Sequence, residues 1–189
     1  MLESVNINSL IQEISSAKQV KSTDIPDIDL YMDQLTTFLD NKMSGYKRNN
    51  KDKVLTKAMI NNYAKAGLLI PPQNKKYSKE NMILLIMIYR LKQLIPINDI
   101  DRLFAPLFQG MKGDPGFLER IYDIFLEMEQ ERYAKLEKAV LQELDSLNSM
   151  EKLQQEEEQA GKCFLLVMLL LSRAETEKRL AEKIIDSYL

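Results

Sequence analysis

The sequence predicts an all-helical protein with one small extended wing, and three observations lead to this prediction. Apolar residues recur at helical spacing through most of the 189 residues. Glycine and proline number only six each, and they fall mostly between the periodic blocks, which favours long helices and few turns. One strand-like stretch stands out, LLIPPQNKKY at residues 68–77, with a proline pair and a basic tip. We interpret it as a wing held down by its leucines and tyrosine.

Two helices are expected in the first 45 residues. Apolar residues at helical spacing predict a short amphipathic helix over residues 5–17. Pro26 then interrupts the helical pattern. A second helix is expected over about 29–43, with Asp27 or Asp29 as its N-cap.

A short helix over residues 57–65 has a start signal and a stop signal. Thr56 is its expected N-cap and Gly67 its C-terminal stop. Four apolar residues form one face, which we expect to be buried: Leu55, Met59, Ile60 and Tyr63. The opposite face is small, amide and basic, without an acid: Ala58, Asn61, Asn62 and Lys65.

After the wing the sequence predicts two more helices of the same domain. Ser78 is the expected cap of a helix over about 79–94, whose run 82–89 is apolar on all sides and must be deeply buried. Another helix is expected over about 99–109, bent or ended at Pro106 and closed by Gly110.

Two long helices complete the chain. Asp114-Pro115 predicts the start of a helix that runs to about residue 148, and a final helix is expected over about 160–187. The apolar run 163–171 is too short for a membrane span, which needs about 20 residues, so we expect it to be buried. The expected seam of the first long helix comprises Phe117, Ile121, Ile124, Met128, Leu136, Val140, Leu144 and Leu147.

Charge is distributed unevenly. The formal net charge is only −2, but residues 42–92 hold twelve basic and two acidic residues, a local charge of +10. The remainder holds 14 basic and 26 acidic residues. A basic block of this density favours a polyanionic partner.

Composition excludes several kinds of site. Histidine is absent, which removes imidazole metal sites and histidine-based nucleophile triads. The one cysteine, Cys163, cannot form an internal disulfide, and we expect a buried, inert thiol. No glycine-rich phosphate loop or convergent carboxylate pair occurs. We therefore expect no enzyme, no metal and no cofactor. The N-terminus MLESVNINSL is unlike a signal peptide, which favours a cytoplasmic location.

From Thr56 to about Leu107 the sequence resembles the MerR-like winged helix-turn-helix. The residues that carry the resemblance are LTKAMINNYAKAGLL (55–69), PPQNKKYS (71–78) and ENMILLIMIYRLKQLIPINDIDRLF (80–104). The whole chain also resembles an uncharacterised bacterial family known only as a domain of unknown function. The MerR-like resemblance implies a DNA-binding domain over 24–110. We expect an N-terminal helix and linker (1–23) before it and a helical dimerisation or regulatory region (111–189) after it.

The same resemblance implies that the 57–65 helix reads DNA. Asn61 and Asn62 stand where that family usually has an arginine and an aromatic residue. Asparagine can bond adenine bidentately, so base readout is assigned to this pair. Lys75 stands where the family has its wing arginine. The expected contacts to phosphate are Lys57, Lys65, Lys75 and Lys76, with Lys47, Arg48, Lys51 and Lys53 as further candidates from the preceding loop.

The sequence leaves two alternatives open. The first concerns function: the polar helix face is either a DNA-reading surface in a transcription regulator or an ordinary solvated face, in which case the protein is an interaction or scaffold module. The second concerns the C-terminal helices, which present more apolar surface than two helices can bury alone. They form either a homodimer or an internal hairpin. The sequence names no effector molecule.

Overall fold

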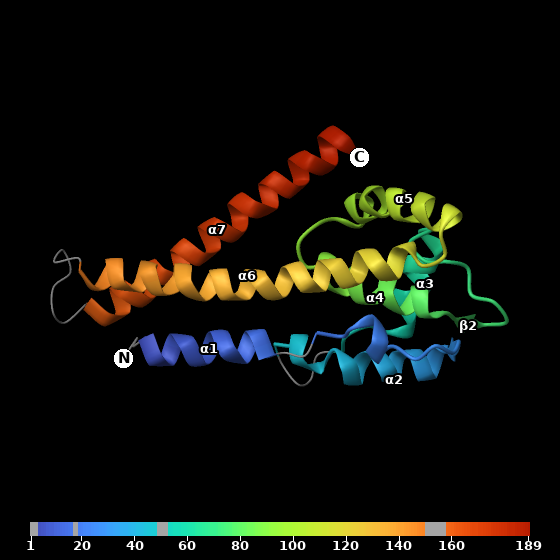
Figure 1. Cartoon of the computed structure of the whole chain (residues 1–189), viewed down its shortest axis with the longest axis horizontal. Coiled ribbons are helices and arrows are strands. Elements are labelled where there is room, and N and C mark those ends of the chain that lie inside the picture. The colour runs from blue at the N-terminus through green and yellow to red at the C-terminus, as the bar shows by residue number, and fades with distance from the viewer. Residues whose placement is uncertain (1–3, 17–18, 49–52, 150–157) are drawn as a thin grey trace. The chain divides into compact units, whose positions relative to one another are not determined.

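A computed structural model describes residues 4–16, 19–48, 53–149 and 158–189 (Figure 1). Within these ranges it has seven α-helices and one two-stranded sheet, which confirms the all-helical prediction. The chain divides into two compact units. One comprises residues 18–126 and 182–189, and the other comprises residues 1–17 and 127–181. The two longest helices, α6 (Phe117–Asn148) and α7 (Glu158–Tyr188), each contribute to both units.

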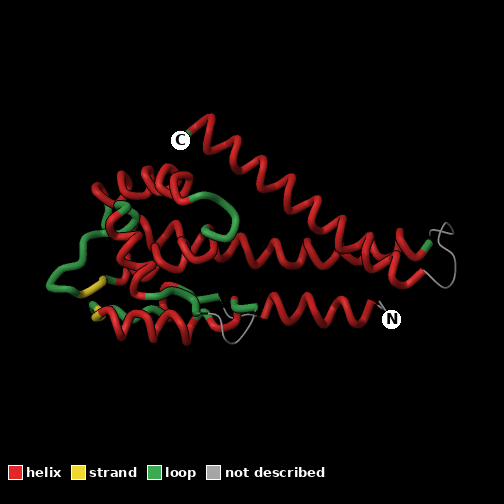
Figure 2. The backbone as a smooth tube through the Cα atoms, turned by 180° about the vertical axis from the view of Figure 1, so that it is seen from behind, coloured by secondary structure: helices red, strands yellow, loops and turns green. Residues whose placement is uncertain are grey.

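The unit of residues 18–126 contains the wing and the helices around it. Its helices are α2 (Met32–Lys42), α3 (Lys57–Lys65), α4 (Lys79–Leu91) and α5 (Ile97–Gly113), with the start of α6. Strand β1 (Leu30–Tyr31) pairs antiparallel with β2 (Lys76–Tyr77), in the register Leu30 to Tyr77 and Tyr31 to Lys76 (Figure 2). The helix expected from residue 29 therefore begins at Met32, because the residues before it extend to pair with β2.

Helix α4 lies at the centre of this unit. Residues 81–86 and Ile88 are buried, whereas Met87 and Tyr89 are partly buried. The predicted burial of the run 82–89 is therefore confirmed for most of its length. The Oγ of Ser78, its N-cap, accepts a hydrogen bond from the Asn81 N–H at 3.5 Å. The α4 residues share one apolar core with Leu35 and Leu39 of α2, with Ile60 of α3, and with residues of α5 and α6.

Helix α5 is longer than the sequence predicts. It begins after Pro96 instead of Asn98 and continues through Pro106 and Gly110 to Gly113. Pro106 is exposed, so its ring lies on the solvent side, where water can satisfy the carbonyl left without an N–H donor. A Cβ at Gly110 would lie 2.3 Å from the Phe117 ring. Gly110 therefore permits close contact with α6 and does not end α5.

The first half of α6 buries a different stripe from the expected one. Its buried residues are Leu118, Tyr122 and Leu126, whereas Ile124 and Met128 are 51% and 67% exposed. The helix begins at Phe117, after a turn in which Asp114 Oδ1 accepts the Gly116 N–H at 2.9 Å.

Several polar contacts fasten the N-terminal segment of this unit to α6. The Tyr122 hydroxyl donates a hydrogen bond to the Val20 carbonyl at 2.6 Å, and both residues are buried. The Ser22 hydroxyl donates to Asp123 Oδ2 at 2.6 Å. These bonds explain why the segment before α2, which has little regular structure, is nevertheless fixed.

The second unit contains α1 (Ser4–Ser16), the later part of α6 and the earlier part of α7. Its core consists of Ile7, Ile11, Val140, Leu144, Leu147 and Leu166. Ion pairs Arg173–Glu143 and Arg132–Glu177 join α7 to α6. The two helices form an internal hairpin that buries the later part of the expected α6 seam.

The expectation of a buried 163–171 run is wrong. Only Leu166 is buried in this run, while Phe164 is 64% and Leu171 59% exposed. Cys163 is exposed as well. None of the described helices is long and apolar enough to cross a membrane.

Candidate nucleic-acid interface

Helix α3 is defined by local signals at both ends. The Thr56 hydroxyl accepts a hydrogen bond from the Met59 N–H at 3.3 Å, as an N-cap does. At the other end Gly67 has a φ of +79°, its N–H bonds to the Ala64 carbonyl at 3.2 Å, and the Leu68 N–H bonds to the Tyr63 carbonyl at 3.0 Å. This pair of bonds is a Schellman motif, for which glycine is the preferred residue.

The two faces of α3 differ as predicted. Ile60 and Tyr63 are buried and Met59 is partly buried, and burial raises the pKa of the Tyr63 phenol. Tyr63 is therefore a neutral packing residue. The opposite face carries the exposed residues Ala58, Asn61, Asn62 and Lys65. Helix α3 contains no acidic residue, so this face offers amide groups and a positive charge without local repulsion of an anion.

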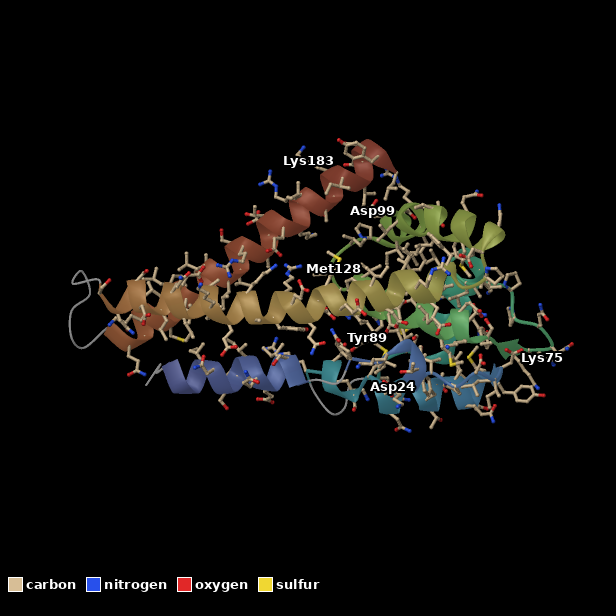
Figure 3. All side chains as sticks on the ribbon, in the orientation of Figure 1. Asp24, Lys75, Tyr89, Asp99, Met128 and Lys183 are labelled. Atoms are coloured by element: carbon tan, nitrogen blue, oxygen red, sulfur yellow. The ribbon has the colours of Figure 1, made fainter. Side chains whose placement is uncertain are left out.

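The tip of the wing is a tight turn of strained residues. Gln73 pairs with Lys76, whose N–H bonds to the Gln73 carbonyl at 2.8 Å. Between them Asn74 and Lys75 have φ values of 50° and 64°, the geometry of a type I′ turn. Lys75 is exposed at the tip (Figure 3). A lysine held in a left-handed conformation is uncommon, and here it presents an ammonium group to solvent.

The second wing lysine is held in place. The Lys76 Nζ lies 5.0 Å from the centre of the Tyr31 ring, and the two residues are neighbours in the β1–β2 pair. Sequence reasoning missed the role of Tyr31, because the contact joins residues 45 positions apart. It also missed the left-handed Asn74, although asparagine before a lysine pair in a loop is a local sign of such a turn.

A groove of about 520 Å³ lies between α2 and the start of α3. Its lining includes Asp40 and Asn41 of α2, Lys53 and Thr56 of the loop, and Lys57. The first amide groups of a helix and the helix dipole favour an anion such as phosphate at this end. Lys57 forms an ion pair with Asp33 of α2, and both side chains are well exposed.

Two of the predicted phosphate ligands come from the loop after α2, and they differ in environment. The Lys47 Nζ lies 2.7 Å from Asp40 Oδ1, and the Lys47 side chain is only 9% exposed. The hydrogen bond from Lys47, together with one from the Val54 N–H at 3.3 Å, holds the pKa of Asp40 below its ordinary value. Lys47 thus joins the loop to α2. Arg48 is exposed, and the further candidate Lys51 lies outside the described residues.

Other charges of the basic block are also used inside the fold. Lys79 donates to Glu119 at 2.8 Å, a bond that raises the pKa of Lys79. Arg90 lies between the rings of Tyr46 and Phe125, and burial lowers the pKa of Lys92. Within the described residues, the exposed cations of the block that form no ion pair include Lys53, Lys65 and Lys75.

Comparison with known proteins yields one finding, and it concerns the same part of the chain. No curated protein matches the sequence, and no solved structure matches it. A model of one protein family matches residues 20–125, which is more than half of the chain and nearly coincides with the compact unit of residues 18–126. The MerR-like resemblance stays a prediction. The chain belongs to the family described as Domain of unknown function (DUF1836).

Proposed function

We propose that the protein is a DNA-binding transcription regulator of the MerR-like winged helix-turn-helix type. In this proposal α2 and α3 are the two helices of the motif, and residues 68–77 are its wing. The observation that carries the proposal is the outer face of α3, where Asn61, Asn62 and Lys65 are exposed on a helix without an acid. The exposed Lys75 at the strained wing tip supports it.

Asn61 and Asn62 are the base-reading residues of this proposal. An asparagine amide can accept a hydrogen bond from adenine N6 and donate one to N7 in the major groove, and a bidentate pair contributes about 1–3 kcal/mol of discrimination against the wrong base. Both side chains are exposed, so no packing contact has to break before they enter a groove. Replacing Asn62 should change which sequence is preferred.

Phosphate contacts are assigned to exposed cations around α3 and the wing. Lys65 and Lys75 are exposed and form no ion pair with a described residue. Lys57 and Lys53 line the groove at the N-terminus of α3, where a phosphate would compete with Asp33 for Lys57. Lys76 of the wing and Arg48 of the loop after α2 are two further proposed phosphate contacts. We leave Lys47 out of it, because its side chain is only 9% exposed and its ammonium group is paired with Asp40.

The test compares two variants on a panel of duplexes that differ at single base pairs. Lys75→Ala should weaken binding to every duplex by the same factor, because phosphate contacts carry no sequence information. Asn62→Ala should flatten the preference at one or two positions. Lys183→Ala is the control, since Lys183 is an exposed lysine of the same unit, far from the wing (Figure 3). Equal losses on all duplexes for the Asn62 and Lys75 variants would refute this division of roles.

A specific observation favours a second candidate function, an interaction or scaffold module without DNA binding. Lys47 and Lys57 are neutralised by Asp40 and Asp33, so the basic block offers fewer available charges than its sequence suggests. A scaffold would show no salt-dependent affinity for duplex DNA, and Lys75→Ala would have no effect on it.

A further inference from the structure

A small polar cavity, which we call the wing cavity, lies between the wing and the N-terminus of α4. Its volume is about 330 Å³, at the small end of the range for ligand sites. The pairing of β1 with β2 brings the segment before α2 to the same place, and the whole lining belongs to the compact unit of residues 18–126. The polar lining residues are Asp29, Gln73, Lys76, Ser78, Glu80 and Asn81.

One lining residue is buried and has an unused hydrogen-bond acceptor. Asn81 is only 1% exposed, and its Oδ1 accepts no hydrogen bond from any described residue. A buried acceptor without a donor is costly, and such atoms in folded proteins nearly always have a partner. The Asn81 amide can turn about its last side-chain torsion, whose energy well is broad, and so present its oxygen to the wing cavity. A donor inside the cavity would then satisfy it.

Two carboxylates on the wing cavity also await a cation. Asp29 is exposed and Glu80 is partly buried, and neither forms an ion pair with another described residue. The ammonium group of Lys76, which lines the same cavity, lies 5.0 Å from the centre of the Tyr31 ring. Two negative charges and one positive charge therefore surround the cavity, and the balance favours a ligand with a positive charge.

The acceptors and the charges together indicate the class of ligand. A primary ammonium group offers three N–H donors and a single charge, which matches an amide oxygen beside carboxylates. A divalent metal ion fits less well, because Lys76 and the positive end of the α4 dipole repel its double charge. In the described part of the chain there is also no cluster of three or more histidine, cysteine or acidic residues placed to hold a metal.

We propose that the wing cavity binds a small alkylammonium compound. Its ammonium group donates hydrogen bonds to Asn81 Oδ1 and to the Glu80 carboxylate, and Asp29 supplies a second negative charge. Ile70 and Pro71 also line the cavity, and they contact the carbon chain of the ligand. The proposal does not depend on DNA binding.

The first experiment is isothermal titration calorimetry of the full chain with 1,4-diaminobutane as the probe. The wild type should bind one equivalent. Glu80→Gln should raise the Kd at least about tenfold, because a charge-assisted hydrogen bond becomes a neutral one. Asp101→Asn is the matched control: Asp101 is an exposed acid of α5 outside the cavity, and its replacement should leave the Kd unchanged. Tetramethylammonium, which is charged but has no N–H donor, should not bind.

The second experiment follows thermal unfolding of Asn81→Leu with and without the probe. Leucine is similar in size to asparagine and has no acceptor. Without the probe this variant should unfold at the wild-type Tm or above it, because no buried polar atom is left unpaired. The probe should raise the Tm of the wild type, since it binds the folded state, and should leave the Tm of Asn81→Leu unchanged.

Four results would overturn the proposal. Absence of binding by the wild type, with a lower Tm for Asn81→Leu, would show that an internal donor or a bound water already satisfies Oδ1. Equal binding of tetramethylammonium and 1,4-diaminobutane would show a general attraction to acidic surface. An unchanged Kd in Glu80→Gln would place the bound probe elsewhere. Displacement of the probe by magnesium chloride at constant ionic strength, in the wild type but not in Asp29→Asn, would assign the cavity to a metal ion.

Discussion

Replacing Lys75 by glycine should stabilise the fold and weaken DNA binding at the same time. Lys75 has a φ of 64°, and the left-handed conformation costs a non-glycine residue about 1–2 kcal/mol. Glycine removes this strain but increases the backbone freedom of the unfolded chain, which offsets about 0.4–1 kcal/mol. The exposed side chain leaves no packing behind. We therefore expect Lys75→Gly to raise the free energy of unfolding by about 0.5–1 kcal/mol, which corresponds to about 1–4 °C in Tm for a chain of this length.

The expected loss of DNA affinity follows from the charge. Each phosphate contact contributes a salt slope of about −0.9. At about 0.15 M salt the loss of one contact therefore reduces affinity by about fivefold. Urea unfolding followed by circular dichroism measures the first effect, and fluorescence anisotropy with labelled duplex DNA measures the second.

Two further variants separate strain from charge. Lys75→Ala removes the ammonium group and keeps the strained backbone, so it should lose affinity without a gain in stability. Asn74→Gly, one residue earlier in the same turn, keeps the lysine and should leave affinity unchanged. If Lys75→Gly lowers stability, the assigned turn geometry is wrong, and if it binds DNA as tightly as the wild type, the wing does not contact phosphate.

Three other predictions concern the parts of the fold that hold the candidate interface. Gly67→Ala should lower the free energy of unfolding by about 1 kcal/mol, because the φ of +79° is strained for alanine. The cost comes from the backbone alone, since no atom lies within 4 Å of the new Cβ. An unchanged urea midpoint would contradict the Schellman motif at the end of α3. Tyr122→Phe should destabilise by about 1–3 kcal/mol, since it leaves the buried Val20 carbonyl without its donor at 2.6 Å, and the measurement is again a urea midpoint. Asp40, whose pKa is lowered mainly by the hydrogen bond from Lys47, contributes stability that is fully present above its ordinary pKa of 3.8 and is lost as pH falls through the lower folded value. Asp40→Asn should therefore make unfolding midpoints less sensitive to pH between about 5 and 2, and an equally steep acid limb in the variant would refute this role.

Features specified by nearby residues could be predicted from the sequence. The start and end of α3 depend on Thr56 and Gly67, which lie within one turn of the helix they limit. The division of its two faces followed from helical spacing, and the buried run in α4 followed from its continuous apolar character. For these elements tertiary packing agrees with the local signals.

Features that depend on distant partners could not be predicted. Strand β1 forms because Leu30 meets Tyr77, and Lys47 is neutralised by an acid on α2. Helix α6 has two adjacent apolar stripes, and the one that packs into the core contains Leu118 and Tyr122. The run 163–171 is apolar on most sides, so its composition gave no sign of which face would remain exposed.

The most direct test of the proposed function is the salt dependence of binding between the full chain and duplex DNA from upstream of its own coding sequence. Fluorescence anisotropy at salt concentrations from about 0.05 to 0.2 M gives the slope of log K against log salt. Four to six phosphate contacts predict a slope of about −4 to −5, with one sequence bound more tightly than the others. Absence of binding at the lowest salt concentration would contradict the proposal and favour the scaffold function.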